Sequence, residues 1–304
     1  MLQAGTVSDI IEMSFELLPV RGCGLRLLPF MPLLWLRVAV SCYAAGLLYA
    51  LALLSRRGES WRRIIMPIVS LGMVFHFISL AEAAAIEHLT LASVHYSESL
   101  LAFLVMLIFM IVRVKYKTTS PGLFVFPLVF LLTFVSAIGQ APLRFSNPVL
   151  QRGWVFLHIA LILTGYAALF ISFTASVLYL VQTRSLKDKR HVGQTPGISS
   201  RLPALEVIDD IGYKSLLLGF PFMTLGLVAG AAIAEARFGP VYFGDAKVML
   251  SLLMWLVYVV LLYTRWNNGW RGRRAAYLAA FAFIAALGAW VANFFSSFHR
   301  FVTP

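Results

Sequence analysis

The sequence predicts an all-α protein, a polytopic membrane helix bundle of about eight transmembrane helices with the N- and C-termini outside. Of the 304 residues, 60% are hydrophobic and only 12% are charged, and the mean hydropathy is +0.84. Globular proteins in water have about a quarter of their residues charged, so a chain this apolar needs lipid as its solvent. In addition, its apolar residues form long runs that are separated by clusters of Arg and Lys.

Eight apolar runs have roughly the length that a helix needs to cross about 30 Å of hydrocarbon, which is about 20 residues. In chain order these runs cover 33–54, 64–86, 97–112, 121–139, 154–182, 212–234, 247–264 and 275–298. The third run is short and the fifth is long. Residues 1–30 mix charged residues with short apolar stretches and lack a signal-peptide pattern. We therefore expect an N-terminal surface segment over 1–30, with Met31 as an alternative true start, and one membrane domain over 31–304.

The basic residues predict how the helices are oriented. The loops after the first, third, fifth and seventh runs are rich in Arg and Lys, whereas the loops between them are poor in both. Cytoplasmic loops carry such an excess, so both termini are predicted to face outward. The longest of these loops, 183–211, contains Pro and Gly and is predicted to be flexible. These clusters account for the net charge of +12, and without a basic stripe that also carries aromatics we expect no nucleic-acid binding.

Two histidines that are far apart in the sequence are predicted to lie at one depth near the outer surface. His158 follows the start of the fifth run by about one turn, and His299 comes just after the eighth run. Imidazole is a good axial ligand for haem iron, and two such ligands from different helices are what a bis-histidine haem requires. The alternative is that each histidine is an interfacial hydrogen-bonding group.

The predicted outer loop 238–245 combines aromatic and polar side chains. Phe238, Tyr242 and Phe243 supply area that can cover a flat apolar ligand, while Asp245 and Lys247 supply polar groups. The alternative is an aromatic belt at the membrane surface, which is common in membrane proteins.

Several segments are informative when their order and spacing are taken together. They are Trp154-Val155-Phe156-Leu157-His158, Gly165-Tyr166-Ala167-Ala168, Leu202-Pro203-Ala204-Leu205-Glu206, Trp270-Arg271-Gly272-Arg273-Arg274, 293–299 and, earlier, 87–100. With these segments the chain resembles the CcsA/ResC-type cytochrome c assembly family, with the closest likeness to its YpjD-like (HemX-like) branch. The resemblance covers roughly residues 33 to 304 and is strongest from 154 onward.

This resemblance implies a cytochrome c assembly-type transmembrane domain over 31–304 that holds haem at the outer face for cytochrome c assembly. It also implies the bacterial inner membrane as location, and the lipid bilayer, apocytochrome c and other biogenesis proteins as partners. The family uses two outward histidines on either side of a W-G-x-x-W-x-W-D loop, and His158 and His299 match those histidines. The loop is degenerate here: Phe238, Tyr242 and Gly244 stand at the tryptophan positions, whereas Gly239 and Asp245 match.

His76 lies near the middle of the second run, where an unpaired polar ring is costly. One interpretation is a hydrogen bond between helices. The other is a deeper haem ligand, because the further histidine that full assembly proteins have within the membrane corresponds to Tyr263 here. Glu82, six residues after His76, lies on a different helix face, so we expect no direct pair between them.

The sequence contains no Walker loop, no G-x-S-x-G and no H-E-x-x-H pattern. We therefore expect a binding or assembly role rather than an enzyme. One alternative is a transporter or transporter-accessory protein that kept the scaffold without haem transfer, since Arg37, His76, Glu82 and Lys214 lie in or near helices. Another is a scaffold that acts through the loop 183–211.

Overall fold

A computed structural model describes residues 32–54, 61–86, 94–138, 154–187, 202–239, 245–267 and 269–291. All regular structure in these ranges is helical, which confirms the predicted class. The helices are α2 (Pro32–Leu54), α3 (Arg62–Ile86), α4 (Val94–Tyr116), α5 (Gly122–Ile138), α6 (Trp154–Lys187), α7 (Leu205–Phe238), α8 (Ala246–Asn267) and α9 (Arg273–Val291).

Seven of the described helices are long and apolar enough to cross a membrane, and α5, with 17 residues, is a shorter apolar helix. The protein is therefore a multi-pass membrane helix bundle. The predicted outward orientation of both termini stays a prediction, and the predicted surface segment 1–30 lies outside the described residues.

The expected length of the third helix is wrong, whereas the fourth predicted run, 121–139, agrees with α5 to within one residue at each end. The third helix is not short, because α4 has 23 residues and includes polar side chains at both of its ends. His95, which lies outside the predicted run 97–112, is in the first turn of α4. The shortest described helix is instead α5, which ends at Ile138.

The prediction of a flexible loop over 183–211 is wrong at both ends. Helix α6 continues to Lys187, and α7 begins at Leu205. Each of these helices has 34 residues, about 51 Å at 1.5 Å per residue, which exceeds the thickness of the hydrocarbon. Their polar turns extend beyond it, where water and ion pairs can satisfy charged side chains, so hydropathy alone underestimates both helices.

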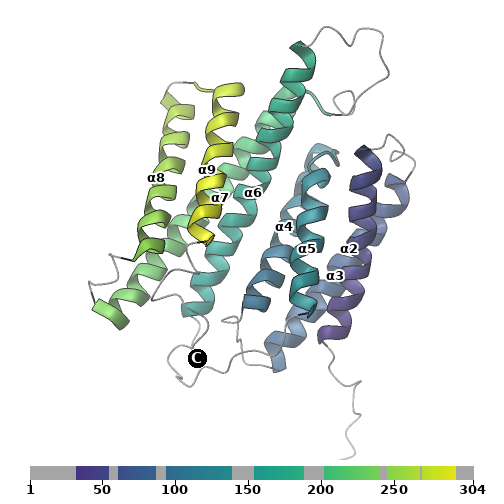
Figure 1. Ribbon diagram of the computed structural model, residues 1–304, viewed down its shortest axis with the longest axis horizontal. Coiled ribbons are helices and arrows are strands. Elements are labelled where there is room, and N and C mark those ends of the chain that lie inside the picture. The colour runs from purple at the N-terminus through teal and green to yellow at the C-terminus, as the bar shows by residue number, and fades with distance from the viewer. Residues whose placement is uncertain are drawn as a thin grey trace, which may run out of the picture. The chain divides into compact units, whose positions relative to one another are not determined.

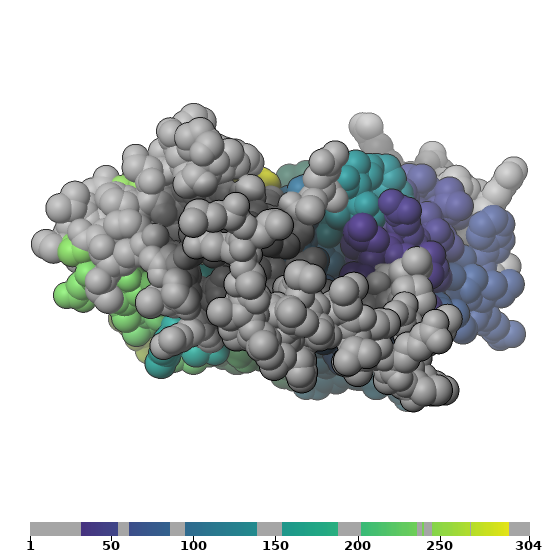
Figure 2. All heavy atoms as spheres, turned by 90° about the horizontal axis from the view of Figure 1, so that it is seen from below, coloured from purple at the N-terminus to yellow at the C-terminus, as the bar shows by residue number. Residues whose placement is uncertain are grey.

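The helices pack in two groups, α2–α5 and α6–α9 (Figure 1). In the first group α2 contacts α3 and α5, and α4 contacts α5; in the second, α6 contacts α7 and α9, and α8 contacts α9. The main link between the groups is the packing of α4 against α6. Figure 2 views the molecule from below, and there α2 (purple) lies on the opposite side from the green residues of the second group. Residues on α3 and on α6 therefore belong to different groups.

The most extensive contact between two helices joins α6 and α7, and glycines line it. Gly212, Gly219 and Gly226 recur at seven-residue intervals along α7. A Cβ atom at Gly226 would lie 2.7 Å from the Ile162 side chain, and one at Gly165 would lie 3.0 Å from the Met223 backbone nitrogen. Small residues let membrane helices approach closely, so the two backbones are held in one register.

Candidate functional site

His158 lies in the second turn of α6, and its ring faces α7. Its Nδ1 atom is 2.7 Å from the carbonyl oxygen of Gly226. A carbonyl oxygen only accepts hydrogen bonds, so Nδ1 carries the proton and donates it. In the neutral ring, Nε2 then holds the lone pair that can bind a metal ion.

The His158 ring also packs against Gly230, one helical turn beyond Gly226. A Cβ atom at Gly230 would lie 2.5 Å from Cε1 and 2.8 Å from Nδ1 of the ring. Only glycine fits here without displacing the ring or the helix. The two glycines thus hold the imidazole in one orientation.

The start of α8 carries two polar residues of the predicted site. Asp245 precedes the helix and is buried; its Oδ1 accepts a hydrogen bond from the backbone N–H of Lys247 at 2.9 Å, and its carbonyl oxygen accepts one from Met249 at 3.1 Å. Asp245 therefore caps α8. Lys247, in the first turn of α8, is half-buried, and its charge acts electrostatically on the His158 ring.

The other predicted residues of the outer site lie partly or wholly outside the described residues. Tyr242 and His299 lie wholly outside the described residues, and of Phe238 only the backbone is described. Phe238 is the last residue of α7 rather than part of a loop, and Gly239 ends the helix with a positive φ of 66°. The pairing of His158 with His299, and the aromatic cover, stay predictions.

His76 is fully buried between three helices. Its Nε2 lies 2.8 Å from the Ser99 hydroxyl of α4, and its Nδ1 lies 3.3 Å from the Tyr43 hydroxyl of α2. Both ring nitrogens therefore have hydrogen-bonding partners, which supports the interpretation as a hydrogen bond between helices. A role as a deeper haem ligand stays a prediction. The partner of Glu82 is not His76 but the Trp35 indole, from which it accepts a hydrogen bond at 3.1 Å.

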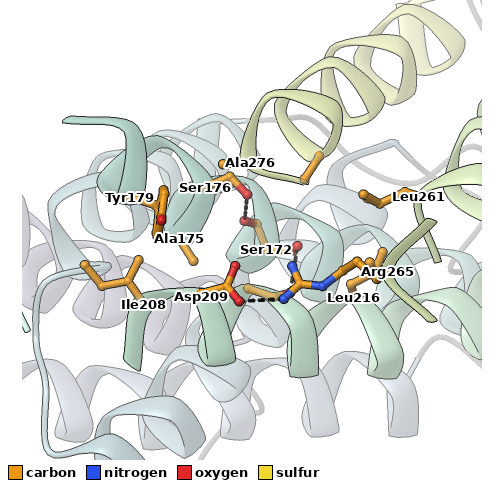
Figure 3. A pocket seen from close by; sticks show the side chains of 12 residues that line it. Ser172, Ala175, Ser176, Tyr179, Ile208, Asp209, Leu216, Leu261, Arg265 and Ala276 are labelled. Atoms are coloured by element: carbon orange, nitrogen blue, oxygen red, sulfur yellow. Dashed lines mark hydrogen bonds and ion pairs between the residues drawn. The ribbon is translucent and has the colours of Figure 1, made fainter. Parts of the chain in front are cut away.

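A small polar cavity lies near the opposite end of α6, between α6, α7, α8 and α9 (Figure 3). Asp209 and Arg265 form an ion pair of 2.7 Å in its wall, and Ser172 donates a hydrogen bond to the Gly212 carbonyl at 2.8 Å. The cavity volume is about 10 Å³, which is room for about one water molecule. It cannot hold a macrocycle in this conformation.

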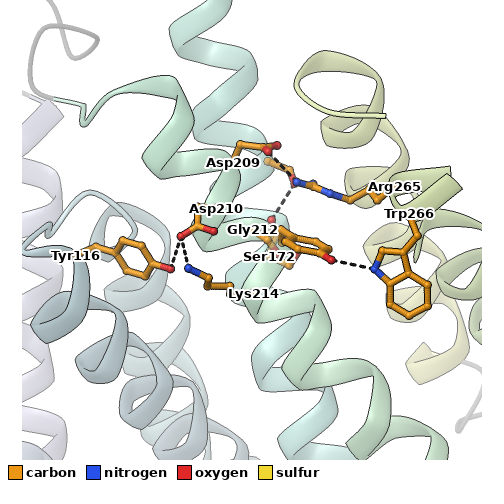
Figure 4. A network of polar contacts seen from close by, with 10 residues as sticks. Tyr116, Ser172, Asp209, Asp210, Gly212, Lys214, Arg265 and Trp266 are labelled. Carbon is orange, nitrogen blue, oxygen red and sulfur yellow. Dashed lines mark hydrogen bonds and ion pairs between the residues drawn. The ribbon is translucent and has the colours of Figure 1, made fainter. Parts of the chain in front are cut away.

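Beside this cavity, a network of polar contacts connects α4, α7 and α8 (Figure 4). Asp210 accepts a hydrogen bond from the Tyr116 hydroxyl at 2.8 Å and pairs with Lys214 at 2.6 Å. The Arg265 guanidinium, paired with Asp209, also lies 4.5 Å from the centre of the Tyr213 ring. These contacts stabilise the packing of α7 against its neighbours at the end predicted to be cytoplasmic.

Reasoning from the sequence missed this network because it assigned Asp209 and Asp210 to a loop. Two signals were present. Pro203 followed by Glu206 is typical of a helix start, and Asp210 and Lys214 have the four-residue spacing of a helical ion pair.

Comparison with known protein families identifies the chain. The family described as "Cytochrome C assembly protein" matches residues 91–301, which is more than half of the sequence. The chain belongs to this family. The matched residues include His158 and the start of α8, whereas α2, α3 and His76 precede the matched range.

Individual relatives are named "Cytochrome c biogenesis protein CcsA". The protein of Heterosigma akashiwo is 30% identical over 219 residues, which is 61% of this chain and 68% of the relative. That of Guillardia theta is 30% identical over 207 residues (62% and 68%), and that of Prochlorococcus marinus subsp. pastoris is 26% identical over 256 residues (78% and 81%). The predicted membership of the CcsA family is confirmed.

Proposed function

We propose that this cytochrome c assembly protein binds haem beside the outer ends of α6 and α8 and holds it for cytochrome c assembly. The observation that carries the proposal is the hydrogen bond from His158 Nδ1 to the Gly226 carbonyl. Histidines that bind metals usually donate their other N–H group to a carbonyl or carboxylate, which fixes the ring and makes it a better ligand. The relatives' shared name supports the same role.

The residues around His158 fit the chemistry of haem, an apolar macrocycle with two carboxylate side chains. Trp154 lies one turn before His158 on the same helix face, and 69% of its surface is exposed, so its indole can stack on an apolar ring. Lys247 offers a cation for a carboxylate. When bound, haem would supply an iron that imidazole nitrogens can ligate, and His158 and His299 are the residues that would hold it.

The protein is proposed to bind and position its ligand without turnover, as part of the bacterial inner membrane. Apocytochrome c and other biogenesis proteins are the proposed partners. Because Phe238, Tyr242 and Gly244 stand where the family has tryptophans, we further propose that the chain belongs to the YpjD-like branch. These replacements also reduce the apolar area that can contact haem. Each Å² of lost apolar contact costs about 25 cal/mol, so we propose that haem is bound more weakly here than by a loop with three indoles.

The transporter alternative rested on ionisable residues in or near the helices. Lys214, one of those residues, is paired with Asp210, and Glu82 accepts a hydrogen bond from Trp35. His76 lies in a hydrogen-bonded contact between three helices. These contacts give three of the four residues a structural role, which favours the haem-binding proposal.

The test is the Soret absorption of the purified protein, reconstituted with haem in detergent. His158→Ala should lose most of the band, and the double replacement of His158 and His299 by Ala should abolish it. His158→Gln separates the two roles of the residue, since glutamine can still donate to the Gly226 carbonyl but offers no imidazole nitrogen to iron; it should also lose the band.

The matched control is His95→Ala, which removes a histidine from the corresponding end of α4 and should leave the Soret band unchanged. All variants are compared at equal recovery of monodisperse protein. A normal band in the double variant would contradict the proposal and direct attention to His76.

A further inference from the structure

Two exposed arginines on different helices neighbour Tyr277 of α9 at the far end of α6 from His158. Arg184 lies in the last turn of α6, and its Nη2 atom is 3.5 Å from the Tyr277 hydroxyl of α9. Arg273, the first residue of α9, lies four residues before Tyr277 and so shares its helix face. Tyr277 is 45% exposed, so the three groups form a surface feature.

The positive charge at this place is not neutralised within the described part of the chain. The three ion pairs found there do not include Arg184 or Arg273. Lys187, Arg271 and Arg274 are exposed on the same two helix ends. Like charges gathered at one place repel each other, and an anion bound among them would remove that repulsion.

The residues beside the arginines form an exposed apolar surface that suits a lipid molecule. Phe281 and Ile284 follow Tyr277 at intervals of four and three residues and so share its face of α9. They are 59% and 60% exposed, which leaves an apolar track toward the membrane centre. The cation of Arg274 lies 5.9 Å from the centre of the Trp270 ring, and tryptophan at a helix end is typical of the membrane surface.

We propose that Arg184, Arg273 and Tyr277 bind the phosphate of an anionic phospholipid, whose acyl chain lies along Phe281 and Ile284. Guanidinium groups suit phosphate because their planar N–H donors match its oxygens. Basic pockets between transmembrane helices on the cytoplasmic side bind lipid headgroups in this way. The site is about 39 Å along α6 from His158 and does not depend on the haem proposal.

The experiment measures phospholipid binding to the full-length protein in detergent by native mass spectrometry. Wild type should bind phosphatidylglycerol more tightly than phosphatidylcholine. Replacing both Arg184 and Arg273 by Gln should weaken phosphatidylglycerol binding about thirtyfold, from the contribution of each basic residue at a membrane surface. Arg273→Gln alone, should the double variant not fold, is expected to weaken it about fivefold.

The matched control replaces Arg62 and Arg63 by Gln. These exposed arginines neighbour each other at the start of α3, at the same end of the bundle, and their loss should change binding less than threefold. Equal losses in both double variants, or equal affinities for the two lipids in wild type, would overturn the proposal. So would displacement of the lipid by millimolar glycerol phosphate, which would indicate a site for soluble phosphates.

Discussion

Adding one methyl group at Gly230 should displace His158 and weaken haem binding. The new Cβ would lie 2.5 Å from Cε1 of the ring, whereas ordinary van der Waals contact begins at 3.4 Å. Either the ring or α7 must therefore move by about 0.9 Å. A movement of that size along the hydrogen bond would lengthen the 2.7 Å contact with Gly226 to about 3.6 Å, too long for a hydrogen bond.

The energetic cost of Gly230→Ala follows from three contributions. Overpacking costs about 1–3 kcal/mol, and loss of the hydrogen bond costs about 1 kcal/mol. Alanine regains about 1 kcal/mol over glycine in a helix. The net destabilisation is therefore about 1–3 kcal/mol. Because the imidazole also loses its fixed orientation, we expect haem affinity to fall about tenfold or more, since about 1.4 kcal/mol corresponds to a factor of ten.

Haem titration followed by the Soret band, together with thermal unfolding in the same detergent, measures both effects. Gly288→Ala is the matched control, because a Cβ there meets no atom within 4 Å; it should leave haem affinity unchanged and stability equal or higher. If Gly230→Ala lost stability but bound haem normally, the orientation of His158 would not matter for binding. If neither property changed, the close contact itself would be refuted.

Three further predictions concern stability and topology. Arg265→Gln should destabilise the protein by about 3 kcal/mol in thermal unfolding, because Asp209, only 20% exposed, loses its ion-pair partner. Adding Asp209→Asn should recover part of this loss. If it recovered none, the two residues would not be energetically coupled. His76→Phe should cost about 2–4 kcal/mol, since it leaves two buried hydroxyls without their partner, and an unchanged unfolding temperature would contradict the hydrogen-bonding role. A cysteine at Pro304 should react with a membrane-impermeant reagent from outside, and labelling only from the cytoplasmic side would reverse the predicted topology.

The helices themselves could be predicted from the sequence because lipid imposes a local requirement. Every backbone polar group in hydrocarbon must be satisfied within its own helix, so an apolar run of sufficient length is almost enough by itself to predict a transmembrane helix. The prediction failed where this requirement ends. Beyond the hydrocarbon, α6 and α7 continue as polar turns that include Arg184 and Asp210. A search for apolar runs does not recognise these turns as helix because of their charged residues.

The sequence alone also predicted the family to which the chain belongs, while its assignment of His158 as a haem ligand stays a prediction. It did not predict which nitrogen of that ring is available, because the deciding partner is the Gly226 carbonyl, 68 residues later in the chain. A backbone carbonyl is present at every residue and leaves no mark in the sequence; only the close packing of α6 against the glycines of α7 selects one. Likewise, the sequence assigns Arg184 and Arg273 to two separate loops, and only the packing of α6 against α9 brings Arg184 to the Tyr277 hydroxyl on the helix that Arg273 begins. Helix formation in a membrane is a local property of the chain, whereas the chemistry of its side chains is set by neighbours that only tertiary packing supplies.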